Sequence, residues 1–148
     1  MTLFEASVEV AAPPAAVWAT LLDWEGTERW MVPPTTVSVL GDQRLGIGTR
    51  LYAVTTVVRA VRLVDHMVVT EWVPEREIRV RHVGWIVRGD GIFRVTPVPG
   101  GTRFGWIEDM PLPMGVIGEI IGWVFRRFVE RSLRRSCGNL ARVTLEHA

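Results

Sequence analysis

Three titratable side chains, those of His66, His82 and Glu108, are the residues of this 148-residue chain that could carry acid–base chemistry. Each lies in a segment whose alternation of apolar and polar residues predicts a strand with this side chain on the inner face. If the three meet at one end of a pocket, they can orient a ligand's carbonyl or hydroxyl group, or act as general acid and base. The alternative is that each is solvated at a strand end or satisfied individually.

Successive side chains of a strand point to opposite faces, so one residue known to be outside assigns the inner face of its strand; this alternation is called parity below. On 65–73 the charged Asp65 and Glu71 are expected outside, which turns His66 and Trp72 inward together with Val68 and Thr70. The same argument gives the other expected inward residues: Ile78, Val80 and His82; Phe93 and Val95; and Phe104, Trp106, Glu108 and Met110. The predicted face is mostly aromatic and aliphatic with a few polar groups, which is typical of a small-molecule site.

Motifs for other chemistry are absent. The chain has no phosphate-binding glycine loop, no HExxH and no CxxC, and its three histidines lack metal-ligand spacing. Cys137 is the only cysteine, which excludes an internal disulfide and cannot by itself form a structural zinc site. The sequence therefore predicts no metal and no cofactor.

The elements that would position these residues follow from periodicity and turn residues. Phe4, Ala6, Val8 and Val10 alternate with polar residues and predict a strand, and prolines 13 and 14 open a short helix. A second short helical turn is expected at 27–31. Strands follow near 37–39 and at 49–58, 65–73, 76–85, 91–98 and 102–110, with tight connections that favour an antiparallel meander. A long helix is predicted from about 114 to 145.

This order resembles the Bet v 1/START-like (SRPBCC) superfamily, in its polyketide cyclase/dehydrase and lipid-transport-like branch. The matching segments are VEVAAPPAAVWATLLDWEGTERW near the start, GIGTR at 46–50, VTEWVPEREIRVRHVG at 69–84 and PVPGGTRFGWIED at 97–109. The resemblance covers essentially the whole chain as a single domain, 1–148. It implies an α+β helix-grip fold, in which a seven-stranded antiparallel sheet wraps around the C-terminal helix, with two short helices after strand 1.

The resemblance also implies a deep cavity between the sheet and the C-terminal helix. Combined with strand parity and helical phase, it gives the expected ligand-binding residues: Trp30, His66, Trp72, His82, Phe93, Trp106, Glu108, Met110, Gly118, Ile121, Gly122 and Phe125. Trp30 is expected either at the cavity mouth or on the surface. Gly118 and Gly122 are expected to clear volume where the helix crosses the cavity, and Trp18 is expected in the core.

Two features of the last helix stay open in the sequence. Trp123 falls outside the apolar arc of Ile117, Ile121, Val124, Phe125, Phe128, Val129, Leu140 and Val143, and it could pack under a loop or mark an oligomer contact. Arg127, Arg131 and Arg134 form a basic stripe, which we interpret as a solvated face, with an anionic ligand or a membrane contact as the alternative.

Two functions are the main candidates from these observations, and a third, an interaction-only role, rests on Trp123 and the basic stripe. The first is a binding module that encloses a hydrophobic or aromatic, lipid- or polyketide-like molecule; the second is an aromatase/cyclase that uses His66, His82 or Glu108 in aldol closure and dehydration. The net charge of +1 argues against nucleic acid, and the apolar stretch 114–125 is too short to span a bilayer. We expect a cytoplasmic monomer or homodimer.

Overall fold

The computed structural model of the protein describes residues 2–59, 61–84, 87–110 and 116–147. A seven-stranded antiparallel sheet has the order β1-β7-β6-β5-β4-β3-β2, so β1 and β2 form its two edges. Its strands are β1 (Thr2–Val10), β2 (Thr35–Leu40), β3 (Arg50–Val58), β4 (Val61–Val73), β5 (Glu77–Val83), β6 (Arg88–Val98) and β7 (Gly101–Met110). The helices are α1 (Pro14–Leu22), the 3₁₀ helix η1 (Trp24–Arg29) and α2 (Val116–His147). The predicted α+β helix-grip fold is confirmed.

The first elements form as their sequence indicates. Phe4, Ala6 and Val10 of β1 are buried on one face of the strand, in register with β7. Pro14 occupies the first turn of α1, where its missing N–H is not needed, and α1 buries Trp18 against the core. The expectation that Trp18 is a core residue is confirmed.

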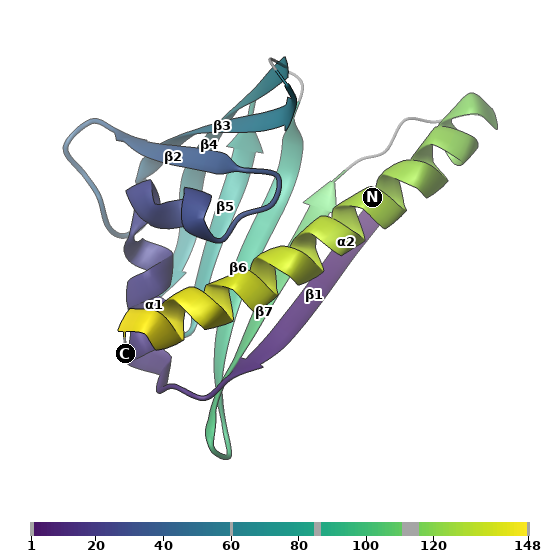
Figure 1. Ribbon diagram of the computed structural model, residues 1–148. Coiled ribbons are helices and arrows are strands. Elements are labelled where there is room, and N and C mark those ends of the chain that lie inside the picture. The colour runs from purple at the N-terminus through teal and green to yellow at the C-terminus, as the bar shows by residue number, and fades with distance from the viewer. Residues whose placement is uncertain (1, 60, 85–86, 111–115, 148) are drawn as a thin grey trace.

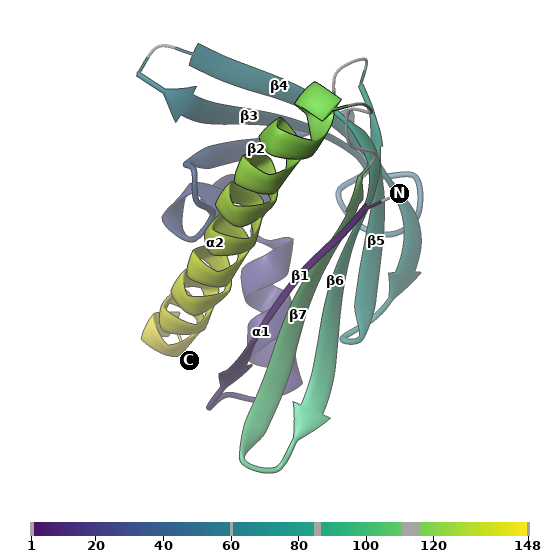
Figure 2. The same cartoon turned by 90° about the vertical axis from the view of Figure 1, so that its right-hand side faces the viewer.

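The sheet curls so that its concave face is covered by helices (Figures 1 and 2). The helix α2 crosses that face diagonally beside β1, while η1 packs against β2 and α1 contacts β6, β7 and α2. One core cluster, which includes Phe4, Ile78, Phe104 and Leu140, all fully buried, packs between the sheet and the helices.

Strand β4 changes the face that it turns inward partway along its length. Its pairing with β5 shifts at a β-bulge between Val69 and Glu71. Before the bulge, Asp65, Met67 and Val69 face inward; after it, Trp72 faces inward and packs edge-on against Trp18 at 5.4 Å between ring centroids. One extra residue reverses the alternation, so a single parity cannot describe the strand.

The two halves of α2 differ in burial. Its second half buries Leu133, Cys137, Leu140 and Val143. In its first half Trp123, Val124, Phe125 and Phe128 are between 38% and 60% exposed, because this part extends past the sheet edge (Figures 1 and 2). Of the described residues of the expected apolar arc, Leu140 and Val143 are therefore buried, whereas Val124, Phe125 and Phe128 are exposed. No helix in the described part of the chain is long and apolar enough to cross a membrane.

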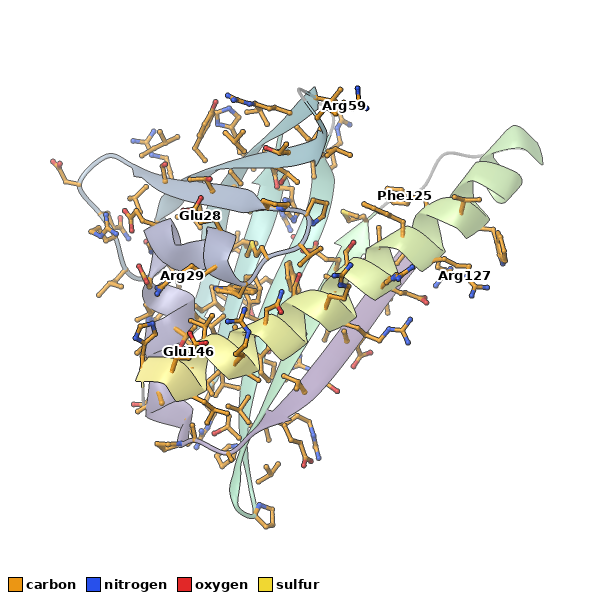
Figure 3. The ribbon with its side chains drawn as sticks, viewed as in Figure 1. Glu28, Arg29, Arg59, Phe125, Arg127 and Glu146 are labelled. Atoms are coloured by element: carbon orange, nitrogen blue, oxygen red, sulfur yellow. The ribbon has the colours of Figure 1, made fainter. Side chains whose placement is uncertain are left out.

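The two features of α2 that the sequence leaves open, Trp123 and the basic stripe, are both exposed in the structure. Trp123 is 60% exposed, and the guanidinium group of Arg127 stacks over its ring at 5.1 Å from the centroid. Arg127, Arg131 and Arg134 are all exposed, as a solvated face requires. Figure 3 shows Phe125 and Arg127 leaving this part of α2 in opposite directions.

Candidate functional site

A cavity of about 190 Å³ lies on the inner face of the sheet. Its walls come from the end of α1, from η1 and the segment after it, and from strands β2 to β7. The lining residues are Leu21, Trp24, Thr27, Trp30, Met31, Pro33, Thr35, Val37, Leu51, Ala53, Thr55, Asp65, Met67, Val80, His82, Phe93, Trp106 and Glu108. The walls are thus largely apolar and aromatic, with one group of titratable side chains.

These titratable side chains form a chain of hydrogen bonds along one wall, here called the Asp65–His82–Glu108 chain. Nδ1 of His82 donates to Oδ2 of Asp65 at 2.7 Å, and Nε2 of His82 donates to Oε2 of Glu108 at 3.2 Å. The indole Nε1 of Trp106 donates to Oε1 of Glu108 at 2.8 Å. His82 and Glu108 are each only 8% exposed, so these bonds form in a dry environment where they hold the side chains firmly.

The two carboxylates control the protonation of His82. Burial alone would lower the pKa of the imidazole, but hydrogen bonds from His82 to Asp65 and Glu108, together with their negative charges, outweigh it. The net result raises the pKa of His82 from its ordinary value of 6.5 to about 10. At neutral pH the ring is therefore an imidazolium with both N–H groups already engaged.

A glycine makes the contact between His82 and Glu108 possible. His82 is on β5 and Glu108 is on β7, and Gly91 of the intervening strand β6 pairs directly with Glu108. A Cβ atom at Gly91 would lie 3.1 Å from Oε1 of Glu108, which is tighter than ordinary van der Waals contact. The missing side chain leaves room for the Glu108 carboxylate to reach across β6.

Aromatic rings form the neighbouring part of the cavity wall. The ring of Trp30 packs edge-on against Trp106 at 5.7 Å and against Phe93 at 6.4 Å between centroids. Trp30 is 2% exposed, so of the two placements expected for it, the surface is wrong. Such edge-to-face contacts add to the stability that burial provides and fix the shape of the wall.

The cavity is not lined by the described residues of α2, contrary to the prediction of a cavity between the sheet and the C-terminal helix. Nδ2 of Asn139 donates to the backbone oxygen of Trp30 at 3.3 Å, and the backbone N–H of Val32 donates to Oγ of Ser136 at 2.9 Å. Because α2 binds the segment after η1 in this way, that segment lies between the described part of α2 and the cavity. The sequence carries no signal for this arrangement.

The predicted site residues fall into those that line the cavity and those that lie elsewhere. Trp30, His82, Phe93, Trp106 and Glu108 line the cavity. Others lie elsewhere: Trp72 packs on Trp18, Phe125 packs edge-on against Phe4, and Met110 and Gly122 are outside the cavity wall. Gly118 and Ile121 belong to residues 116–121, whose side chains lie outside the described part of the structure.

His66 is the clearest correction. It is exposed on the outer face of β4, where its ring packs edge-on against Tyr52 at 5.1 Å between centroids. Asp65, which parity places outside, takes the inner position and the contact with His82. The β-bulge between Val69 and Glu71 explains both errors. The predicted alternation is correct for the residues after the bulge, but the bulge reverses it for the residues before it.

Trp24 and Gly91 are among the residues of the site that the sequence did not single out. Trp24 of η1 lines the cavity, and its Nε1 donates to the backbone oxygen of Arg44 at 3.1 Å. Gly91 begins the strand predicted at 91–98, whereas it lies in the interior of β6, which starts at Arg88. A glycine inside a strand often marks close approach of another group, and that was the available signal.

The cavity can therefore hold an apolar ring and present charge to it. It offers no activated thiol: Cys137 is fully buried on α2, and burial raises the pKa of its thiol to about 12. Within the described residues, the only titratable side chains on the cavity wall are those of the Asp65–His82–Glu108 chain.

Comparisons with known proteins agree with the fold. The chain matches solved structures along nearly its whole length. A protein from Thermus thermophilus has 19% identity and a TM-score of 0.81, covering 99% of both chains. The Zhui aromatase/cyclase from Streptomyces sp. R1128 has 18% identity and a TM-score of 0.76, covering 99% of this chain and 94% of that one. A protein from Nitrosomonas europaea has 15% identity and a TM-score of 0.74, covering 99% and 96%.

At these identities the likeness concerns the fold alone. No curated protein sequence matches the chain. The sequence does match, over residues 1–144, the family described as polyketide cyclase/dehydrase and lipid transport. The cavity, the curled sheet and this match agree, and the chain belongs to the polyketide cyclase/dehydrase and lipid transport family.

Proposed function

We propose that the protein binds a hydrophobic or aromatic small molecule in the cavity between the sheet and the segment formed by η1 and the residues after it. The observation that carries the proposal is the aromatic-walled cavity of about 190 Å³ with a polar group on one side. An apolar cavity of about 150 Å³ is large enough to bind benzene. The preferred ligand body is therefore one or two rings.

The surroundings of the cavity favour such a body. The rings of Trp30, Phe93 and Trp106 are already packed against one another, so little conformational entropy is lost on binding. The Asp65–His82–Glu108 chain supplies the few polar atoms that orient a ligand in such sites. For a ligand of about ten heavy atoms this supports a Kd of the order of 10 μM to 1 mM.

The test is calorimetric titration with indole. We expect saturable binding with one site per chain. In Ala53→Leu the added side chain enters the cavity from β3, where Ala53 is 3% exposed, and binding should fall by about tenfold or more. Ala141→Leu, on α2 and outside the cavity wall, is the matched control and should bind like the wild type. Absence of indole binding, or equal binding by Ala53→Leu, contradicts the proposal.

A second function, acid–base catalysis of cyclisation, has one observation in its favour. His82 and Glu108 meet on the cavity wall, as an acid–base pair would require. Against it, both ring N–H groups of His82 already have carboxylate partners, and a pKa of about 10 is far above that of a neutral-pH base. Binding is therefore the first proposal.

Catalysis is tested with a short poly-β-keto N-acetylcysteamine thioester, with products followed by mass spectrometry. If the pair is catalytic, the wild type accelerates cyclisation, and Glu108→Gln loses at least about a hundredfold of that acceleration. Equal rates for the wild type and Glu108→Gln would exclude a role for Glu108 in the chemistry.

A further inference from the structure

The charged side chains on the cavity wall do not balance. Asp65 and Glu108 are carboxylates and His82 is the single imidazolium between them, which leaves one formal negative charge. Among the described lining residues there is no arginine, and the whole chain contains no lysine. The other wall residues are apolar, aromatic or hydroxyl-bearing, so no nearby cation on the wall offsets this charge. Buried charge of this kind is costly unless it is paired.

One oxygen of this group has no hydrogen-bond partner. Oδ2 of Asp65 accepts from His82, but Oδ1 of Asp65 is buried and has no partner in the described part of the chain. Both oxygens of Glu108 are engaged, one by His82 and one by Trp106. The unmet acceptor of the cavity wall is thus Asp65 Oδ1, next to the unbalanced charge.

The aromatic part of the wall attracts a cation too, as the excess negative charge does. Trp30, Phe93 and Trp106 line the same cavity as the two carboxylates, and Trp24 lies on its η1 side. The face of an aromatic ring attracts a cation, most strongly for tryptophan and when water is excluded. Carboxylates and tryptophan rings around one small cavity form a combination suited to an organic cation.

We propose that the ligand of this cavity is an organic cation, an aromatic body of one or two rings that carries a protonated amine. The ammonium group balances the negative charge of the Asp65–His82–Glu108 chain and donates a hydrogen bond to Asp65, while the rings pack against Trp30, Phe93 and Trp106. This proposal rests on the proposed binding function and specifies its ligand class.

The test compares two ligands that share one body. Tryptamine and tryptophol both carry an indole on a two-carbon chain, and they differ in ending with an ammonium or a hydroxyl group. Calorimetric titration at neutral pH should give an affinity for tryptamine about tenfold or more above that for tryptophol. Equal affinities, or tighter binding of tryptophol, overturn the cation proposal and leave the binding function intact. If none of indole, tryptamine and tryptophol binds, both the cation proposal and the proposed binding function are overturned.

Substitutions of the two carboxylates test whether they cause the preference for tryptamine over tryptophol. In Asp65→Asn the excess charge is removed, and the ratio of the two affinities should fall to within about threefold of one. Glu108→Gln removes the same charge from the other end of the chain and should act alike, so the test survives if one variant does not fold. Asp90→Asn is the control, because Asp90 pairs with Arg81 at 3.2 Å on the outer face. A preference that persists in both cavity variants contradicts the proposal.

Discussion

Nε2 of His82 lies 3.2 Å from Oε2 of Glu108, although the two residues belong to strands β5 and β7 and β6 runs between them. The contact exists because β6 places Gly91 opposite Glu108. With Asp65 on β4, the group of charged side chains on the cavity wall thus comes from three strands. The rest of the wall is largely apolar and aromatic. The charged group should determine how the protein responds to pH and to substitutions around the cavity.

His82 should stay protonated well above neutral pH. The two carboxylates raise its pKa to about 10, so its ring is expected to remain an imidazolium at about pH 8, where a free histidine is neutral. The ¹⁵N chemical shifts of its ring report the protonation state directly. A neutral ring at that pH would show that Asp65 and Glu108 do not hold the proton.

The same proton should make the stability depend on pH. Because the folded pKa is raised, protonation of His82 favours the fold; its contribution is complete below about pH 6.5 and is lost as the pH rises through about 10. The free energy of unfolding should fall over this window by up to about 1.4 kcal/mol per pH unit. In His82→Gln this contribution should vanish, as measured by urea unfolding across the window. Parallel curves for the two proteins would contradict it.

Gly91→Ala should weaken the contact between His82 and Glu108. The added Cβ would lie 3.1 Å from Oε1 of Glu108 and 3.2 Å from Cγ2 of Val80, so the carboxylate must shift. We expect a lower pKa of His82 and a loss of about 1–2 kcal/mol in the free energy of unfolding. Gly105→Ala on β7 is the control, since its nearest contact would be at 4.0 Å. Equal effects of the two substitutions would show that Gly91 has no special role.

Trp106→Phe should cost more stability than its loss of volume explains. The substitution removes the indole N–H that donates to Oε1 of Glu108 at 2.8 Å, and a hydrogen bond to a charged group contributes about 1.5–3 kcal/mol. Trp18→Phe is the matched control, because Trp18 packs on Trp72 as a core ring. Denaturant unfolding of both variants gives the comparison. Equal losses would mean that the Trp106–Glu108 bond contributes little.

Much of the fold was predictable, because its signals are local. The alternation of β1, the prolines before α1, the Pro99–Gly101 turn between β6 and β7 and the long final helix each appear in a short stretch of sequence. His82, Phe93, Trp106 and Glu108 were placed correctly on inner faces for the same reason, since β5, β6 and β7 keep their alternation.

The rest of the site depends on relations that no single segment displays. The exchange of Asp65 for His66 follows from a bulge farther along the same strand, whose position is set by pairing with β5. Coverage of the cavity by Trp30 depends on contacts that α2 makes more than a hundred residues later in the chain. Trp123, the basic stripe and the oligomeric state remain predictions without a test.

The most direct test of the central claim is to locate a bound ring by NMR. With indole at saturation, intermolecular nuclear Overhauser effects should connect its protons to the methyl groups of Met67, Val80 and Thr55, which line the cavity on three adjacent strands. The account predicts these contacts in the wild type and their loss in Ala53→Leu. Contacts to the exposed methyl groups of Val124 instead, or none to the cavity, would contradict it.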